Sequence, residues 1–432
     1  MQLLRILTTL ALSTLHVSAL FTPRADPTSY NGIKVLRVLP SSEDATARLL
    51  SVMSELKLET WSDAVVPNED VDVLVPLAQL EAFTRAFPRF ETVHEDLGAD
   101  IRVEKSGPGF VIQKQSSPSL AARSALAADL TWFNAYHPYT THLTWLNELR
   151  AQFPTRSKIV TSGTSVQGRT ITGIHIFGST GGGSRPAILF HGNTHAREWI
   201  SSKVTQYIAY QLLTNYANST DVAALVDKFD FYIFPVVNPD GFTFSQENTR
   251  LWRKNRTPAP SGSTCIGVDL NRNWPFQWSL PDGASTSPCS ETYKGTAAES
   301  TPEIRALHAY AASLIAGQGV QLYVDWHSYG RLVLYPWGYT STAHPSQARF
   351  RTLGNAFATA VRAVRGTAYT VQQAIQLYVT SGTSRDHFAG GLNVPNSFTI
   401  ELPTNTFVLP AGEILPVVRE TWEGVVALLK VL

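Results

Sequence analysis

Cysteine is scarce in this sequence, with two residues, Cys265 and Cys289, in a chain of 432. The count alone excludes a metal site built on several thiolates. An excess of charge is absent too, because the net charge is +1 and charged residues make up only 16% of the chain. Since a nucleic-acid partner calls for a basic surface, we expect none. Beyond the N-terminus no apolar run is long enough to span a bilayer, so we expect no membrane anchor.

The chain begins with the apolar stretch MQLLRILTTLALSTLHVSAL. It combines a basic Arg5, an apolar run over 6–15 and the small-residue pattern at 17–19, which is typical of a secretory signal peptide cut after Ala19. A buried N-terminal helix is the alternative and fits this pattern less well. We therefore expect residues 1–19 to be a signal peptide and the protein to be secreted and extracellular.

An oxidising compartment favours pairing of the two cysteines, and two buried free thiols are the alternative. Hydrophobic residues make up 44% of the chain, enough for a large core, and the length suits two or three domains. We expect a monomer, and no internal repeat is present.

Residues 20–123 form the first expected unit after the signal peptide. Their apolar patterns alternate between strand and helix periods in β-α-β-α-β order, which predicts a small α+β open sandwich. The expected elements are strands at 34–40 and 70–76, helices at 41–58 and 77–87, and a strand-like piece at 91–105.

The segment 106–129 is rich in Ser, Ala, Gly and Pro and is interpreted as an exposed linker. Arg123-Ser124 within it offers a cleavage point to a trypsin-like protease. Cleavage there would separate the small unit from a large one at 124–432.

The large unit alternates strands and helices, and several of its strands are apolar throughout. Such strands predict an α/β fold with a mixed, largely parallel twisted sheet covered by helices on both faces. The expected strands are 169–178, 186–193, 229–242, 320–330, 331–338 and 394–402, and the expected helices are 202–217, 301–317, 346–366 and 412–432. Ligands of such sheets bind beyond the carboxyl ends of strands. His195, Asn238, His327 and Glu401 all lie at or just after expected strand ends.

The stretch HGNTHAREWIS places His195 and Glu198 three residues apart. On one helical turn the two side chains could meet the same ion. A catalytic zinc commonly takes two His and one Glu and keeps one position open, and His327 in YVDWHSYG could supply the third ligand. A surface salt link and a structural histidine are the alternatives, because a His-x-x-Glu pair alone is weakly specific.

Further polar residues follow apolar stretches. They are Arg253 in NTRLWRKNR, Asn271 and Arg272 in CIGVDLNRNWPF, Tyr378 and Arg385 in LYVTSGTSRDHF, and Glu401 in SFTIELP. Ordinary surface, turn and loop residues are the alternative for most of them. A glutamate inside an apolar strand points more firmly to a function, because burying an ionised carboxylate is costly.

These motifs, taken in order, resemble the zinc metallocarboxypeptidases of the pancreatic carboxypeptidase A/B type. The matching stretches are HAREWI, NPDGF, RLWRKNR, VDLNRNW, SPCSETYKG, HSYGRLVLYPWG, YVTSGTSRD and FTIEL, and they cover most of 124–432. The unit at 20–123 resembles the activation propeptide of that family in its order of elements. The resemblance implies a zymogen that binds one zinc ion.

The resemblance also implies roles for single residues. It implies His195, Glu198 and His327 as zinc ligands, Glu401 as general base, Arg253 as the cation facing the oxyanion, Asn271, Arg272 and Tyr378 as the grip on the substrate's terminal carboxylate, Arg197 as part of an outer subsite, and Cys265–Cys289 as a disulfide. The chemistry suits these assignments, because a planar arginine can hold a carboxylate through two hydrogen bonds. A general base and a fixed guanidinium both favour the transition state of hydrolysis.

Arg385 falls where this family places the floor of the pocket for the C-terminal side chain, an arrangement similar to carboxypeptidase O. An arginine there would favour C-terminal Glu or Asp. The alternative is that Arg385 pairs with Asp386 and leaves a pocket of apolar and small residues such as Leu334, Gly338 and Thr399. Pro403 stands where the family has an arginine, and we expect a structural consequence only.

The interpretation is a secreted zinc exopeptidase that acts on peptide or protein C-termini after a trypsin-like protease removes the first unit. One alternative is a non-catalytic binder of peptide C-termini, which would have no need of Glu401. Another is a hydrolase of cell-wall peptides on the same fold. Glycosylation sequons occur at Asn218 and Asn255, and the second lies close to Arg253, where we expect no glycan.

Overall fold

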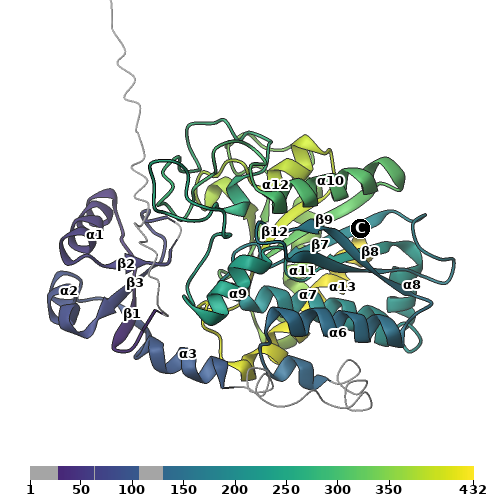
Figure 1. Ribbon diagram of the computed structural model, residues 1–432, viewed down its shortest axis with the longest axis horizontal. Helices are drawn as coiled ribbons and strands as arrows, with labels where there is room; N and C mark the ends of the chain where they lie inside the picture. Colours follow the sequence, from purple (N-terminus) through teal and green to yellow (C-terminus); the bar gives the residue numbers. More distant parts are fainter. Residues whose placement is uncertain (1–27, 63, 107–129) are drawn as a thin grey trace, which may run out of the picture.

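The computed structural model describes residues 28–62, 64–106 and 130–432, which form a small N-terminal unit and a large C-terminal unit (Figure 1). The expected signal peptide at 1–19 and the expected cleavage point at Arg123-Ser124 lie outside the described residues. The domain boundaries therefore stay predictions. Among the described helices, none is both long and apolar enough to cross a membrane.

The N-terminal unit is an antiparallel sheet of four strands in the order β2-β3-β1-β4, with helices against it. Its elements are β1 (Ile33–Val38), α1 (Glu43–Leu56), β2 (Glu59–Thr60), β3 (Val71–Pro76), α2 (Leu80–Ala86), β4 (Glu91–His94) and α3 (Leu97–Lys105). The expected strand-like piece at 91–105 was wrong beyond His94. Asp96 caps α3 there by accepting a hydrogen bond from the amide of Ala99 at 3.0 Å, which starts a helix.

The C-terminal unit is built on eight strands in the order β11-β10-β12-β9-β7-β8-β6-β5. The strands are β5 (Ser157–Thr164), β6 (Thr170–Ile176), β7 (Ala187–Gly192), β8 (Asp230–Phe234), β9 (Val320–Ser328), β10 (Leu332–Tyr335), β11 (Thr370–Gln373) and β12 (Ser397–Leu402). Neighbours from β12 to β8 run parallel, whereas β10, β6 and β5 join by antiparallel pairs. This confirms the mixed, largely parallel sheet, although β5 and β11 were not foreseen.

Helices cover both faces of this sheet. They are α6 (Tyr139–Gln152), α7 (Trp199–Thr214), α8 (Thr220–Lys228), α9 (Pro239–Glu247), α10 (Pro302–Gly317), α11 (Gln347–Arg365), α12 (Ser384–Asp386) and α13 (Ile414–Val431). Ile188 and Phe190 of β7 pack with α7, α11 and α13, while Ala187 and Leu189 pack on the other face with α10. Burial of both faces explains why these strands are apolar at every position.

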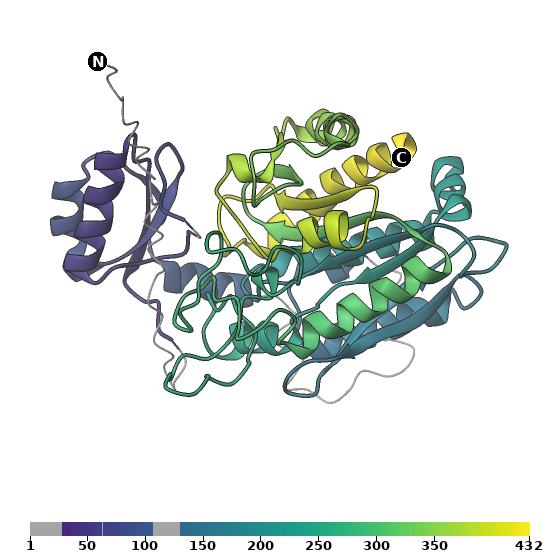
Figure 2. The same cartoon turned by 90° about the horizontal axis from the view of Figure 1, so that it is seen from above.

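The N-terminal unit stands at one end of the C-terminal unit, and α3 reaches along the side of the larger unit (Figures 1 and 2). An apolar cluster joins the two units and includes Tyr30, Trp61 and Ile101 from the first and Leu251 and Phe407 from the second. Side chains of the N-terminal unit thereby come to lie over the loops that follow β9 and β12.

Candidate metal and substrate site

The sheet positions the candidate residues at one edge. β7 ends at Gly192, three residues before His195, and Glu198 stands at the N-cap of α7. His327 lies near the end of β9, and Glu401 of β12 pairs with it in the register of the two parallel strands. The expectation that these residues gather at strand ends is confirmed for His195, His327 and Glu401, as parallel strands require.

His195, Glu198 and His327 are buried and meet at one point. The Nδ1 atom of His195 lies 2.8 Å from Oε1 of Glu198, and Nδ1 of His327 lies 3.0 Å from Oε2. The two Nδ1 atoms are 3.0 Å apart. Atoms that share one zinc ion at about 2.0–2.2 Å must lie within about 4 Å of one another, so the donor set fits zinc. The motif is a turn rather than the expected helical turn, with the amide of Glu198 donating to the carbonyl of His195.

Electrostatics keep this carboxylate ionised and ready to bind a cation. Burial acts to raise the pKa of Glu198, but the neighbouring imidazoles of His195 and His327 outweigh burial and lower the pKa to about 2. A buried acid that stays charged among metal-binding groups is typical of a functional site.

Asp269 links the metal ligands to the arginine expected at the oxyanion. Its Oδ1 lies 3.1 Å from Nε2 of His195, and its Oδ2 accepts from Nη2 of Arg253 at 3.0 Å. Burial acts to raise the pKa of Asp269, but Arg253, His195 and Arg272 hold it well below its usual value. Sequence reasoning did not single out Asp269, although it stands in the quoted motif VDLNRNW, two residues before Asn271.

The remaining candidates other than Arg197 line a small cavity of about 30 Å³ beside the metal ligands. It is lined by His195, Arg253, Asn271, Arg272, His327, Leu334, Ala374, Leu377, Tyr378, Thr380, Thr383, Arg385, Thr399 and Glu401. Asn271 and Arg272 come from a 3-10 turn, and Tyr378 comes from the loop before α12. The structure thus brings together every candidate expected to contact the terminal residue of a substrate.

Arg385 is buried. The sequence left two interpretations open, that its side chain lines the pocket or that it pairs with Asp386, and the structure agrees in part with each. Its Nε donates to Oδ1 of Asp386 at 3.1 Å, as the alternative foresaw. Its Nη1 and Nη2 nevertheless face the cavity wall, where Thr399 and Thr380 accept from them at 3.4 Å each. The guanidinium therefore lines the pocket although it is paired.

Arg197 lies at the border with the N-terminal unit. Its Nη2 donates to the carbonyl of Trp61 at 2.9 Å, and its guanidinium lies 4.2 Å from the centre of the Phe407 ring. The N-terminal unit therefore contacts the residue that the sequence predicts for an outer subsite.

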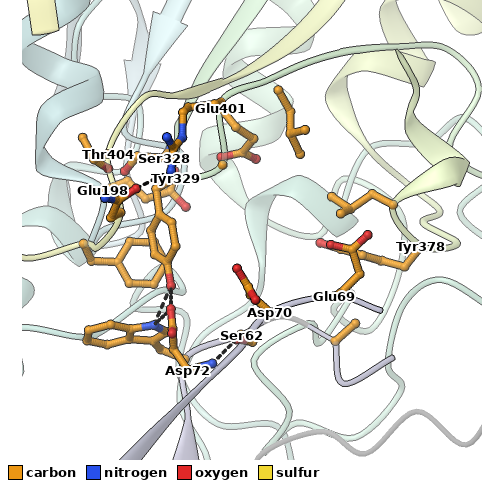
Figure 3. Close-up of a pocket in the computed structure, with 18 of the residues that line it drawn as sticks. Ser62, Glu69, Asp70, Asp72, Glu198, Ser328, Tyr329, Tyr378, Glu401 and Thr404 are labelled. Carbon is orange, nitrogen blue, oxygen red and sulfur yellow. Dashed lines mark hydrogen bonds between the residues drawn. The ribbon is translucent and has the colours of Figure 1, made fainter. Parts of the chain in front are cut away.

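A larger cavity of about 390 Å³ lies between the two units. Figure 3 shows Glu198 and Glu401 on one side of it and Glu69, Asp70 and Asp72 of the N-terminal unit on another. Asp72 accepts hydrogen bonds from the hydroxyl of Tyr329 and, at 2.9 Å, from Nε1 of Trp61. The N-terminal unit thus forms part of the wall of the cavity that reaches His195 and Glu198.

The two cysteines form the disulfide Cys265–Cys289, as expected. Asn218 is exposed, as a glycan would require. Asn255 is buried, and its side-chain amide donates to Glu303 at 3.1 Å. A glycan would disrupt that contact, which agrees with the expectation of none at Asn255.

Comparisons with known proteins agree with this geometry. Residues 142–424 match the zinc carboxypeptidase family, and residues 36–104 match the carboxypeptidase activation peptide. The chain is 41% identical to metallocarboxypeptidase A of Trichophyton rubrum over 428 residues, which cover 98% of each protein. It is 31% identical to carboxypeptidase A1 of Mus musculus over 400 residues, covering 91% of this chain and 92% of the mouse protein. The crystal structure of carboxypeptidase A from Helicoverpa armigera superposes with a TM-score of 0.77 at 28% identity, covering 93% of this chain and 98% of the insect chain.

Proposed function

The chain belongs to the zinc carboxypeptidase family and is a metallocarboxypeptidase with an activation peptide, and we propose that it is secreted as a zymogen and prefers substrates ending in Glu or Asp. The observation that carries the preference is the position of the Arg385 guanidinium. It lines the cavity that also contains Asn271, Arg272 and Tyr378. Its two terminal nitrogens face threonine hydroxyls, so an acidic side chain could replace those weak partners.

In the proposed reaction Asn271, Arg272 and Tyr378 hold the terminal carboxylate of the peptide. This grip restricts cleavage to the last peptide bond, because an internal bond presents no carboxylate. His195, Glu198 and His327 would hold a zinc ion, which would supply a Lewis acid for the scissile carbonyl and would make a water molecule more acidic.

Glu401 accepts the proton of the attacking water and passes it to the departing amine. The guanidinium of Arg253 stabilises the negative charge that develops on the carbonyl oxygen. Asp269 keeps that guanidinium in place by accepting from its Nε at 3.3 Å and from its Nη2 at 3.0 Å. A fixed donor of this kind costs no reorganisation during the reaction.

Control of the proposed zymogen comes from the N-terminal unit. It lines the cavity that reaches the site while the three candidate metal ligands already lie together, which supports inhibition by blocked access rather than by a disrupted metal site. A trypsin-like protease that cuts within 107–129 would then allow the unit to leave. Secretion is supported by the sequence at 1–19.

The test uses protein cut with trypsin and matched acylated dipeptides ending in Glu, Leu or Lys. We expect chelator-sensitive release that favours Glu, and Arg385→Met should lose that advantage by about 10- to 100-fold, the effect of one charge-assisted hydrogen bond. Release that favours Leu in the parent protein would retain the enzyme and reject the acidic preference. Zinc-loaded protein that releases nothing would favour a non-catalytic binder.

A further inference from the structure

Asp325 is a buried carboxylate that the mechanism above does not use. It lies on β9, two residues before His327, and its side chain is shielded from solvent. Alternate residues of a strand face the same side of the sheet, so Asp325 and His327 project toward the same face. Oδ2 of Asp325 lies 2.9 Å from Nε2 of His327.

Asp325 contacts the ring nitrogen of His327 that does not face the other two candidate metal ligands. Nδ1 of His327 lies toward Glu198 and His195, whereas Nε2 lies toward Asp325. A neutral imidazole carries one proton, and a carboxylate next to Nε2 places that proton there. Nδ1 then presents its lone pair to a cation, and the ring is held in one orientation.

The same carboxylate joins segments that are distant in the sequence. Oδ1 accepts from the hydroxyl of Thr194 at 3.0 Å, next to the metal ligand His195. Oδ2 accepts from the hydroxyl of Ser384 at 2.7 Å, next to Arg385. Asp325 therefore contacts one metal ligand directly and binds the neighbours of another ligand and of the expected specificity residue.

The two histidines are thus held in parallel ways by different acids. Asp269 contacts Nε2 of His195 and shares its charge with Arg253, while Asp325 contacts Nε2 of His327. His191 also faces Asp325, with its Nδ1 3.3 Å from Oδ1. Loss of either acid would leave a buried ring nitrogen without its acceptor.

We propose that Asp325 is a positioning residue for the metal centre, holding His327 with Nδ1 toward the metal and fixing the metal ligands to the segment that begins at Ser384. The inference rests on the metal site of the proposed function. It does not depend on which C-terminal residue the enzyme prefers.

The first measurement is the zinc affinity of the purified full chain, obtained by competition with a chelator. Asp325→Asn keeps the size of the side chain but replaces one acceptor oxygen with an NH2 group. We expect a 10- to 100-fold weaker zinc affinity, the usual effect of removing such a partner. The cobalt(II)-substituted protein should also show a changed visible spectrum, which reports ligand geometry without any hydrolysis.

Asp230→Asn is the matched control. Asp230 is equally buried, begins β8 and lies 3.5 Å from Nε2 of His175, but it contacts none of the three metal ligands. We expect this variant to lose thermal stability in the metal-free form and to keep its zinc affinity and cobalt spectrum. A loss of stability alone therefore cannot imitate the expected result.

Asp325→Asn protein with parental zinc affinity and an unchanged cobalt spectrum would overturn the inference. Should that variant not fold, Asp325→Ser retains a smaller acceptor, and the same two measurements decide with the same outcomes. Parent protein that binds no zinc would instead refute the metal site of the proposed function. The two failures are therefore distinguishable.

Discussion

Arg250 and Arg253 are three residues apart, and each is buried and paired with a buried carboxylate, yet their partners belong to different parts of the chain. Arg253 pairs with Asp269 inside the C-terminal unit, 16 residues away. Arg250 pairs with Glu104 of α3 in the N-terminal unit, 146 residues away, through bonds of 2.6 and 2.8 Å. The Arg253–Asp269 pair lies at the candidate site, whereas the Arg250–Glu104 pair joins the N-terminal unit to the C-terminal unit.

The difference shows what would change when the N-terminal unit leaves. The Arg253–Asp269 pair remains intact, so the proposed oxyanion contact is present before and after activation. Arg250 would lose Glu104 and keep its bonds to the carbonyls of Arg197 at 2.7 Å and Phe407 at 2.6 Å. Removing one partner of a buried ion pair leaves the other charge buried without its partner, so we expect changes at Glu104 to weaken the contact between the two units.

The largest effect is expected from Glu104→Ala, which breaks the pair between the units. Removing one partner of a buried ion pair costs about 3–5 kcal/mol. After trypsin has cut within 107–129, the N-terminal unit should therefore bind about 150- to 5,000-fold more weakly. The affinity is measured by titrating the purified N-terminal unit against the activity of the cut enzyme.

Two controls accompany this variant. Glu81→Ala removes an exposed i,i+4 pair with Arg85 on the same unit and should leave the affinity unchanged, since exposed pairs contribute little. The C-terminal unit freed from Glu104→Ala should have parental activity, because residue 104 precedes the cut. Parental affinity in Glu104→Ala would mean that the apolar cluster around Tyr30, Leu251 and Phe407 holds the units together by itself.

A smaller effect is expected from Arg253→Gln, and it concerns the rate of hydrolysis rather than the binding of the N-terminal unit. The amide can still donate to Asp269, but the charge facing the developing oxyanion is gone. The kcat of the cut enzyme should fall about 10²- to 10³-fold with little change in KM, as after loss of an oxyanion donor. Zinc content and the affinity for the N-terminal unit are measured in parallel and should not change. A loss of that affinity would contradict the separation of the two arginine pairs.

The sequence predicted the site residues that stand in ordered motifs and the strands that are apolar throughout. His195, His327 and Glu401 were placed at strand ends because parallel strands present their carboxyl ends at one edge. The Arg250–Glu104 pair was not predicted, since a contact across 146 residues leaves no periodicity in either segment. The strand-like piece expected at 91–105 was right over 91–94 and wrong beyond His94, because the cap at Asp96 was overlooked.

The smallest predicted effect concerns the pH dependence of the same interface, through His94. Its Nε2 lies 2.7 Å from the hydroxyl of Thr406 in the C-terminal unit, and its Nδ1 lies 2.6 Å from Oδ2 of Asp100. The edge of its ring packs against Trp61. Burial lowers the pKa of His94 and outweighs the opposing effect of Asp100; Asp72 also opposes the shift, and Arg250 reinforces it.

The sign follows from which state binds more protons. With a lowered pKa in the complex, His94 is protonated more readily once the N-terminal unit is released, so release is favoured as the pH falls below about 6.5. The complex is therefore most stable above that pH and weakens toward the lowered pKa. In the cut protein we expect dissociation at pH 5 to be several-fold faster than at pH 7.5, an effect of about 1 kcal/mol.

His94→Gln should bind somewhat more weakly at pH 7.5 and lose most of this acid dependence, because glutamine does not titrate. His308→Gln is the control, since His308 contacts Glu299 within the C-terminal unit. Burial raises the pKa of Glu69 and Asp70 around the cavity, so their protonation at low pH favours the complex and opposes the effect of His94. Acid-driven release that persists undiminished in His94→Gln would therefore contradict the role assigned to His94.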